Sequence, residues 1–195
     1  MPNLSCDKLP AVSTESPPLL HRLRADVPPE VADVPAPPVP RVRHPFAVRV
    51  AKPVDAELLS EWMNRPHLVS TWESDWPVWR WRRHLEAQLA GTYSVPVVGS
   101  VDGEAFAYLE FYRAARDAIA TCYDAHPHDL GLHAAIANPD SGNRGVASAV
   151  FPQVMDSVFA QDPQAPVEVV FPPEADSFVS PAPPPSRGSA WPAPW

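Results

Sequence analysis

Proline is the residue that most constrains this chain, because it is abundant and concentrated toward the two ends. The 195 residues include 28 prolines, about 14% where roughly 5% is typical. Eleven lie in residues 1–45, seven in residues 46–160 and ten in residues 161–195. Proline interrupts helix interiors and central strands. We therefore expect a folded domain over residues 46–171, between a mostly disordered proline-rich leader, 1–45, and a proline-rich tail, 172–195.

Charge and hydropathy exclude several classes of protein. The net charge of -8 at pH 7 argues against binding to nucleic acid or to anionic membranes, since both need a positive field. The first residues lack the apolar core of a signal peptide, and no apolar run of about 18 residues occurs. The sequence therefore predicts a cytoplasmic protein with no membrane span. Its two cysteines, Cys6 and Cys122, have no C-x-x-C spacing, and we expect both to be reduced thiols.

The first half of the predicted domain contains one strand pattern and two helix patterns. Phe46–Ala51 alternates in polarity as a half-buried strand does. Asp55 can cap a helix that ends near Asn64, and proline at a first helical turn favours a second helix over Pro77–Ala90. The second helix should bury the residues of an i, i+4 stripe, namely Trp81, Leu85 and Leu89.

The second half of the domain is richer in strands. Tyr93–Val101 and Glu104–Tyr112 are expected to form a hairpin, because Asp102-Gly103 between them is a strong two-residue turn signal. The later elements are a strand, a helix and a short strand, at Asp129–Ile136, about Gly145–Phe159 and Val167–Phe171. This order predicts an α/β fold with one mixed central sheet flanked by helices.

The loop before the last helix has the character of a phosphate-binding loop. Its sequence is Gly142-Asn143-Arg144-Gly145-Val146-Ala147, and glycine at a helix N-terminus permits the close approach of an anion. The element order and this loop resemble the GNAT acyltransferase fold, whose signature is Gln/Arg-x-x-Gly-x-Gly/Ala. Gly145 and Ala147 match that signature, whereas Gly142 stands where Gln or Arg is usual. The resemblance implies that Asn143, Arg144, Gly145 and Ala147 bind the pyrophosphate or phosphopantetheine of an acyl donor.

Longer stretches of sequence narrow the resemblance. They include Glu61–His67, Arg80-Trp81-Arg82, Leu89–Ser94, Tyr108-Leu109-Glu110 and Asp129–His133. They are similar to the siderophore-pathway acyltransferases, a family that includes the mycobactin lysine N-acyltransferases and the aerobactin-type N-acetyltransferases. The resemblance implies transfer of an acyl group from acyl carrier protein or acyl-coenzyme A to the ε-amino group of a lysine, or of a hydroxylated lysine, during siderophore assembly.

His133 is the candidate substrate-binding residue. It matches the family histidine to which substrate binding is assigned, and this role is implied by the resemblance. Strand alternation places it on the face opposite Leu130, Leu132, Ala134 and Ile136, which is also compatible with a purely structural histidine. The family's acidic base is expected near Phe171, where no residue matches it, so the catalytic base stays unassigned.

The resemblance ends at about residue 163. Beyond that point the family continues with a helix and a last strand, whereas this chain continues into Pro181-Ala182-Pro183-Pro184-Pro185. We therefore expect the C-terminal elements of the fold to be missing, through divergence or a shifted reading frame. One alternative is an inactive GNAT-like binding module with proline-rich interaction segments. Another is a GNAT enzyme that acetylates proteins or antibiotics.

Two other clusters permit functional interpretations. Asp124, His126, His128 and Asp129 have zinc-binding side chains, but Pro127 interrupts the run and a solvated loop is the simpler interpretation, so we expect no metal site. Five tryptophans between Trp62 and Trp81 lie near three arginines, at positions 80, 82 and 83. We interpret most of these tryptophans as core and tunnel wall. The arginines suit either an acidic acyl carrier protein or a solvated helix face.

Overall fold

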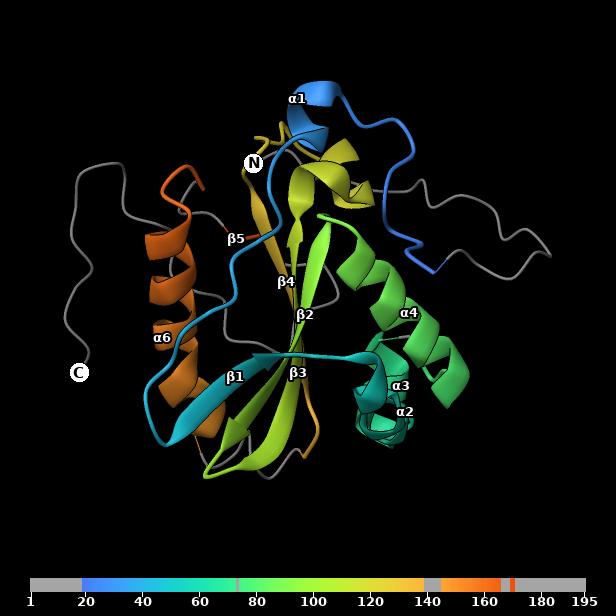
Figure 1. The fold of residues 1–195 in the computed structure, drawn as a ribbon, viewed down its shortest axis with the longest axis vertical. Helices are drawn as coiled ribbons and strands as arrows, with labels where there is room; N and C mark the ends of the chain where they lie inside the picture. Colours follow the sequence, from blue (N-terminus) through green and yellow to red (C-terminus); the bar gives the residue numbers. More distant parts are fainter. Residues whose placement is uncertain (1–18, 73, 139–144, 166–168, 171–195) are drawn as a thin grey trace.

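A mixed five-stranded sheet forms the centre of the described residues (Figure 1). The computed structural model describes residues 19–72, 74–138, 145–165 and 169–170. The strands follow one another in sequence order, as β1 (Phe46–Val50), β2 (Ser94–Val101), β3 (Glu104–Arg113), β4 (Leu130–Ile136) and β5 (Val169–Val170). Neighbours among β1 to β4 are antiparallel, and β5 pairs with β4 in parallel. The expectation of a mixed sheet is confirmed.

Helices cover both faces of this sheet. The helix α6 (Val146–Gln161) lies on one face, and α2 (Ala56–Met63), α3 (Pro66–Trp72) and α4 (Val78–Ala90) lie on the other (Figure 1). Each face has its own core cluster, because alternate residues of a strand point to opposite sides. Leu132 and Phe111 belong to the cluster under α6, whereas Tyr108 belongs to the cluster under α2 and α4.

The expected secondary structure agrees closely with the observed elements. The hairpin between β2 and β3 turns at Asp102 and Gly103, whose φ angles are 49° and 85°. Both values are those of the type I′ turn that Asp-Gly favours. The helices begin and end within about two residues of the expected positions. Two α-helices of the described residues were not expected: α3, which begins at Pro66, and a short helix at Pro29–Ala32.

The chain N-terminal to β1 lies against the domain from Leu19 onward. It contains a short helix, α1 (Pro29–Ala32), which buries Val31. Residues 39–43 run beside α6, where the Arg41 backbone N–H donates to Ser157 Oγ at 2.7 Å. Nearer its start, Leu23 forms an isolated bridge with Asp117, which follows β3. Within residues 1–45, where we expected a mostly disordered leader, the part from residue 19 thus contributes contacts to both faces of the sheet.

None of the helices in the described ranges has the length and apolarity that crossing a membrane would need. The 3₁₀ helices are short, at Pro53–Asp55, Ala114–Arg116 and Ala118–Thr121. The expected divergence after residue 163 falls mostly outside the described residues.

Candidate active site

Helix α4 turns two polar side chains toward the sheet. His84 and Gln88 are buried, with 6% and 2% of their surface exposed, and they share this face with Trp81 and Leu85. The stripe predicted for α4 was right for Trp81 and Leu85 but wrong for Leu89, which is 43% exposed. A buried polar side chain needs hydrogen-bond partners. His84 and Gln88 therefore need hydrogen-bond partners on the facing surface of the sheet.

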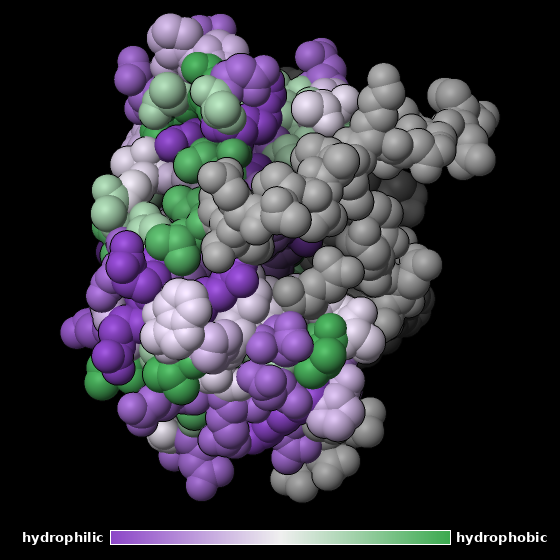
Figure 2. Space-filling model, turned by 90° about the vertical axis from the view of Figure 1, so that its right-hand side faces the viewer, coloured by the Kyte–Doolittle hydropathy of each residue, from purple (hydrophilic) through white to green (hydrophobic). Residues whose placement is uncertain are grey.

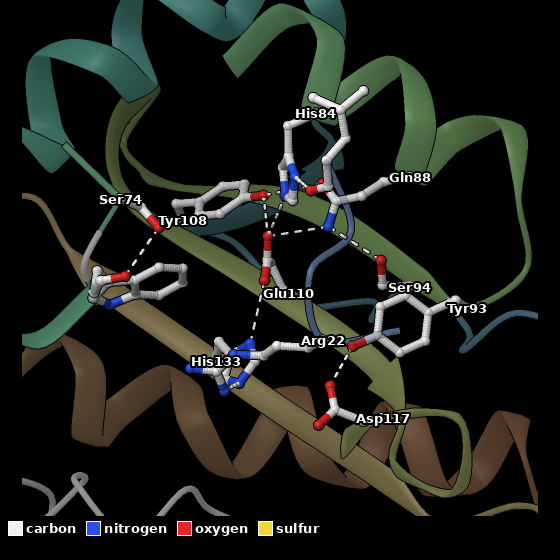
Figure 3. Close-up of polar contacts among 12 residues, drawn as sticks. Arg22, Ser74, His84, Gln88, Tyr93, Ser94, Tyr108, Glu110, Asp117 and His133 are labelled. Atoms are coloured by element: carbon white, nitrogen blue, oxygen red, sulfur yellow. Dashed lines mark hydrogen bonds and ion pairs between the residues drawn. The ribbon is translucent and has the colours of Figure 1, made fainter. Parts of the chain in front are cut away.

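That partner is Glu110, which lies on β3 between Tyr108 and Tyr112 on the same face of the sheet. Its Oε1 is approached by three donors (Figure 3). Tyr108 Oη donates at 2.8 Å and Gln88 Nε2 at 3.0 Å, and His84 Nε2 lies at 3.2 Å. One carboxylate oxygen thus takes hydrogen bonds from both α4 and the neighbouring position on β3.

The second oxygen of Glu110 faces His133. In the register of β3 and β4 these two residues are direct cross-strand partners, and His133 Nδ1 lies 3.2 Å from Glu110 Oε2. The other ring nitrogen, Nε2, lies 3.0 Å from Nη1 of Arg22. Tyr112 stacks on the imidazole with ring centroids 4.5 Å apart, and Trp72 meets it edge-on at 5.9 Å. These contacts fix the plane of the His133 ring.

Glu110 is ionised in this arrangement. Burial alone would raise the pKa of its carboxyl group, but hydrogen bonds from His133 and His84 hold that pKa well below its usual range. The pKa of Tyr108 is raised well above its usual value, by burial first and then by the Glu110 charge. Tyr108 therefore keeps its proton and remains a hydrogen-bond donor.

Both ring nitrogens of His84 face acceptor atoms. Its Nδ1 lies 2.7 Å from the backbone oxygen of Leu19, and its Nε2 faces the Glu110 carboxylate. The cluster therefore places His84 against the Glu110 carboxylate, and the Arg22 guanidinium adds a positive charge nearby.

We expect the stabilisation contributed by Glu110 to be complete above pH 4.5, the ordinary glutamate pKa, and to be lost as the pH falls further. The pKa of Glu110 is lower in the folded than in the unfolded state, so the unfolded chain takes up the proton first as acid is added. Urea unfolding of the wild type and of Glu110→Gln should show this between about pH 7 and pH 3. The difference in unfolding free energy between the wild type and Glu110→Gln should be constant down to about pH 4.5 and should shrink below that pH.

Glu104→Gln is the matched control for this pH series. Glu104 is an exposed carboxylate at the start of the same strand, and its replacement should change the unfolding free energy little at any pH. A Glu110→Gln difference that stays constant down to about pH 3 would contradict the depressed carboxyl pKa.

The predicted donor loop is described only in part. Asn143 and Arg144 lie outside the described residues. Gly145 is the N-cap of α6 with φ of 73°, a left-handed conformation that favours glycine, and Ala147 lies in the first turn. The structure therefore places Gly145 and Ala147 at the N-terminus of a 16-residue helix. No contact joins them to the Glu110 cluster among the described residues.

The histidines and acids of the connector form local structural contacts. Asp129 accepts hydrogen bonds from Tyr123 Oη and from the His126 backbone N–H, at 2.9 and 2.8 Å. His128 Nδ1 lies 3.2 Å from Asp162 Oδ1. The described residues contain no group of three acidic, histidine or cysteine side chains arranged to hold a metal ion.

Cys122 is disulfide-bonded, which corrects the expectation of a reduced thiol, and Cys6 lies outside the described residues.

The tryptophan-rich segment is mostly core, as expected. Trp62, Trp76 and Trp81 are buried, whereas Trp79 is 64% exposed. The guanidinium of Arg80 lies 4.3 Å from the centre of the Trp76 ring, a cation–π contact. Figure 2 shows hydrophilic residues interspersed with hydrophobic ones on the side of the molecule that carries α4. Arg82 and Arg83 are among its exposed residues.

Sequence reasoning singled out His133 as a candidate but not the residues that surround it. The signal for His84 and Gln88 was their place on the apolar face of α4, beside Trp81 and Leu85. The signal for Glu110 was a carboxylate in the alternating pattern of a strand, between two inward tyrosines. Both are buried polar residues on otherwise apolar faces, a pattern often found at functional sites.

The chain belongs to the GNAT acetyltransferase family. The family model described as "Acetyltransferase (GNAT) domain" matches residues 52–179, and it covers all of the Glu110–His133 cluster except Leu19 and Arg22. The resemblance to the GNAT fold is thereby confirmed, as is the α/β class with a central sheet flanked by helices.

Particular relatives agree with this family. The chain is 55% identical over 146 residues to the lysine N-acyltransferase MbtK of Mycolicibacterium paratuberculosis, and the match covers 75% of the chain and 66% of that protein. It is 53% identical over 145 residues to MbtK of Mycobacterium tuberculosis, covering 74% of the chain and 69% of that protein. The chain thus spans about two thirds of the length of these relatives. An N-hydroxyputrescine acetyltransferase of Acinetobacter baumannii is 32% identical, covering 58% of the chain and 55% of that protein.

Solved structures share the fold. An uncharacterized protein from Bacillus halodurans superposes with a TM-score of 0.60 and 24% identity, covering 68% of this chain and 70% of that one. The aminoglycoside acetyltransferase AAC(6')-Ib in complex with coenzyme A superposes with a TM-score of 0.54 and 22% identity, covering 62% of this chain and 70% of that one.

Proposed function

We propose that this chain transfers an acyl group from a thioester donor to the ε-amino group of a lysine, or of a hydroxylated lysine, in the assembly of a mycobactin-type siderophore. The observation that carries the proposal is the identity of 53–55% with two lysine N-acyltransferases over about three quarters of the chain. The likeness to an N-hydroxyputrescine acetyltransferase supports it, because that acceptor is also an amine at the end of an aliphatic chain. The proposed setting is the cytoplasm.

The N-terminus of α6 is the proposed binding place of the acyl donor. The partial positive charge of a helix N-terminus and its free backbone N–H groups favour phosphate oxygens. Gly145 has no side chain to obstruct a phosphate group. Ala147, in the first turn of α6, has only a small one. Asn143 and Arg144 complete the proposed loop. The donor is acyl-coenzyme A or an acyl group on the phosphopantetheine of a carrier protein, and the exposed Arg82 and Arg83 suit an acidic carrier.

The chemistry needs a neutral amine. With a lysine pKa near 10.4, roughly one molecule in 2500 is neutral at pH 7. Once the ammonium has lost a proton, its nitrogen attacks the thioester carbonyl carbon. The C–N bond forms, the C–S bond breaks and the thiol leaves, while the nitrogen gives up a second proton. His133 is the proposed contact of the acceptor amine, because its imidazole is held in a fixed plane beside the ionised Glu110.

A thiol-release assay tests this proposal. With acyl-coenzyme A or acyl carrier protein as donor and lysine or a siderophore precursor as acceptor, the protein should release thiol at a rate that saturates with both substrates. Replacing His133 with alanine should lower kcat/KM for the amine roughly a hundredfold, since a hydrogen bond to a charged group is lost.

The control for this assay is His126→Ala. His126 is exposed in the connector and lies outside the Glu110 cluster, so its replacement should leave turnover unchanged. Saturable donor binding without turnover would favour the inactive binding module. Turnover on aminoglycosides or proteins but not on lysine or siderophore precursors would contradict the proposed acceptor.

A further inference from the structure

We infer that Glu110 is a positioning residue that holds His133 in the tautomer with its proton on Nδ1, so that Nε2 accepts a hydrogen bond from the ammonium group of the acceptor. This inference rests on the proposed function, since it concerns how the same site binds its amine. It gives a role to a buried carboxylate that the transfer chemistry itself does not use.

The tautomer of His133 follows from its two neighbours. A guanidinium has only N–H donors, so the contact of 3.0 Å between Arg22 Nη1 and His133 Nε2 requires Nε2 to accept. An ionised carboxylate has only acceptors, so the contact of 3.2 Å between His133 Nδ1 and Glu110 Oε2 requires Nδ1 to donate. Together the two contacts indicate the tautomer with its proton on Nδ1, the nitrogen that faces Glu110.

Glu110 can impose this tautomer because its own orientation is fixed. Tyr108, Gln88 and His84 all direct donors at Oε1, at 2.8, 3.0 and 3.2 Å. Rotation of the carboxylate would break all three contacts, so Oε2 stays directed at His133 (Figure 3). The side chain of Glu110 is only 13% exposed and that of His133 only 12%, so water cannot easily substitute for either partner.

Arg22 occupies the position at His133 Nε2 that we assign to the acceptor ammonium. Its guanidinium presents a cationic N–H donor to His133 Nε2, which is the same chemistry that a substrate ammonium would present. The backbone around Arg22 is held independently of this contact. The Ala118 N–H donates to the Arg22 carbonyl at 2.8 Å, and the Arg24 N–H donates to the Arg116 carbonyl at 2.9 Å. The long side chain can therefore rotate away while the segment stays in place.

Glu110→Gln tests the inference by reversing the tautomer with little change of shape. The glutamine carbonyl oxygen should take the position of Oε1, because three donors converge there. Its NH₂ group then faces His133 Nδ1, which must accept, and the ring proton moves to Nε2. An ammonium can no longer donate to that nitrogen. Glu104→Gln is the matched control: it makes the same substitution at the exposed start of β3 and leaves Glu110 and its contact with His133 intact.

Two measurements on the full chain distinguish the outcomes. Nitrogen-15 NMR of the histidine rings should place the His133 proton on Nδ1 in the wild type and in Glu104→Gln, and on Nε2 in Glu110→Gln. In the thiol-release assay, Glu110→Gln should raise KM for the amine roughly ten- to a hundredfold with a smaller effect on kcat, whereas Glu104→Gln should leave KM unchanged. Circular dichroism confirms that each variant is folded.

The NMR result is independent of turnover, so it separates this inference from the proposed function. If the wild type carries the proton on Nε2, or if folded Glu110→Gln keeps it on Nδ1, the positioning role is overturned even where lysine is acylated. Unchanged KM in Glu110→Gln with a reversed tautomer overturns the ammonium contact. Arg22→Met should lower KM for the amine severalfold, because the competing cation is gone. An increase in KM in Arg22→Met would overturn the inference that Arg22 and the acceptor ammonium compete for His133 Nε2.

Discussion

Replacing Arg113 with methionine is expected to lower the free energy of unfolding by about 3–5 kcal/mol, because it leaves a buried carboxylate without its main cationic partner. Arg113 ends β3 and is 1% exposed, and its Nη2 lies 2.7 Å from Asp162 Oδ2, on a side chain that is 9% exposed. Burial raises the pKa of the Asp162 carboxyl group, but Arg113 and then His128 lower it below its usual value. Urea unfolding of both proteins at pH 7 measures the difference.

The same guanidinium connects parts of the chain that are distant in sequence. Arg113 Nε donates to the Pro35 carbonyl at 2.8 Å and Nη1 donates to the His128 carbonyl at 3.2 Å. Asp162 follows directly after α6. One side chain therefore ties the segment before β1, the end of β3, the loop before β4 and the end of α6. We expect all four to lose protection from hydrogen exchange together in Arg113→Met.

The control for Arg113→Met is the same substitution at Arg83. Its contact with Glu86 is 3.7 Å, and both side chains are about half exposed or more, at 66% and 49%. Arg83→Met should therefore cost less than about 0.5 kcal/mol. The double variant Arg113→Met, Asp162→Leu should regain part of the lost stability, because no unpaired charge remains buried. A loss at Arg113 no larger than that at Arg83 would refute the buried ion pair.

Elements with strong local signals could be predicted from the sequence. The Asp102-Gly103 turn and the alternation of Phe46–Val50 depend on residues close in the chain, so their patterns needed no tertiary information. At Leu89 the sequence pattern alone gave the wrong prediction of burial. Hydropathy alone placed Leu89 on the buried face of α4, but Gln88 is buried instead, because Ser94 and Glu110 supply its hydrogen bonds.

The surroundings of His133 could not be predicted for the same physical reason. Arg22 lies 111 residues away in sequence and reaches His133 from a proline-rich segment that has no helix or strand pattern. Glu110 was visible as part of a family-like stretch, but its cross-strand pairing with His133 depends on the register of β3 and β4. Contacts of this kind are set by tertiary packing, on which local propensity carries little information.

Replacing Gly131 with alanine is expected to lower the free energy of unfolding by about 1–3 kcal/mol and to disturb the site. Gly131 and Tyr112 are cross-strand partners on β4 and β3, and the tyrosine ring covers the glycine. A Cβ atom at Gly131 would overlap that ring far inside van der Waals contact. A glycine in a strand interior often marks such a close approach, and Tyr112, only 1% exposed, has little room to move.

The disturbance should reach His133, because the ring that must move is the one stacked on it. Tyr112 and His133 have ring centroids 4.5 Å apart, so Gly131→Ala should change the NMR signals of the His133 ring and lower turnover more than the fraction of unfolded protein explains. Gly99→Ala is the matched control, since its Cβ would meet its nearest neighbour, Ala107 Cβ, at 3.6 Å, an ordinary contact.

A double-mutant cycle identifies the cause of the Gly131 effect. In a Tyr112→Ala background the ring is absent, so adding Gly131→Ala should cost much less than it does in the wild type, with a coupling energy of about 1 kcal/mol or more. Equal costs in the two backgrounds would mean that the loss arises from the backbone of β4 and not from the tyrosine. A coupling confined to stability, with His133 signals and turnover unchanged, would mean that the stacked ring supports the fold without orienting the imidazole.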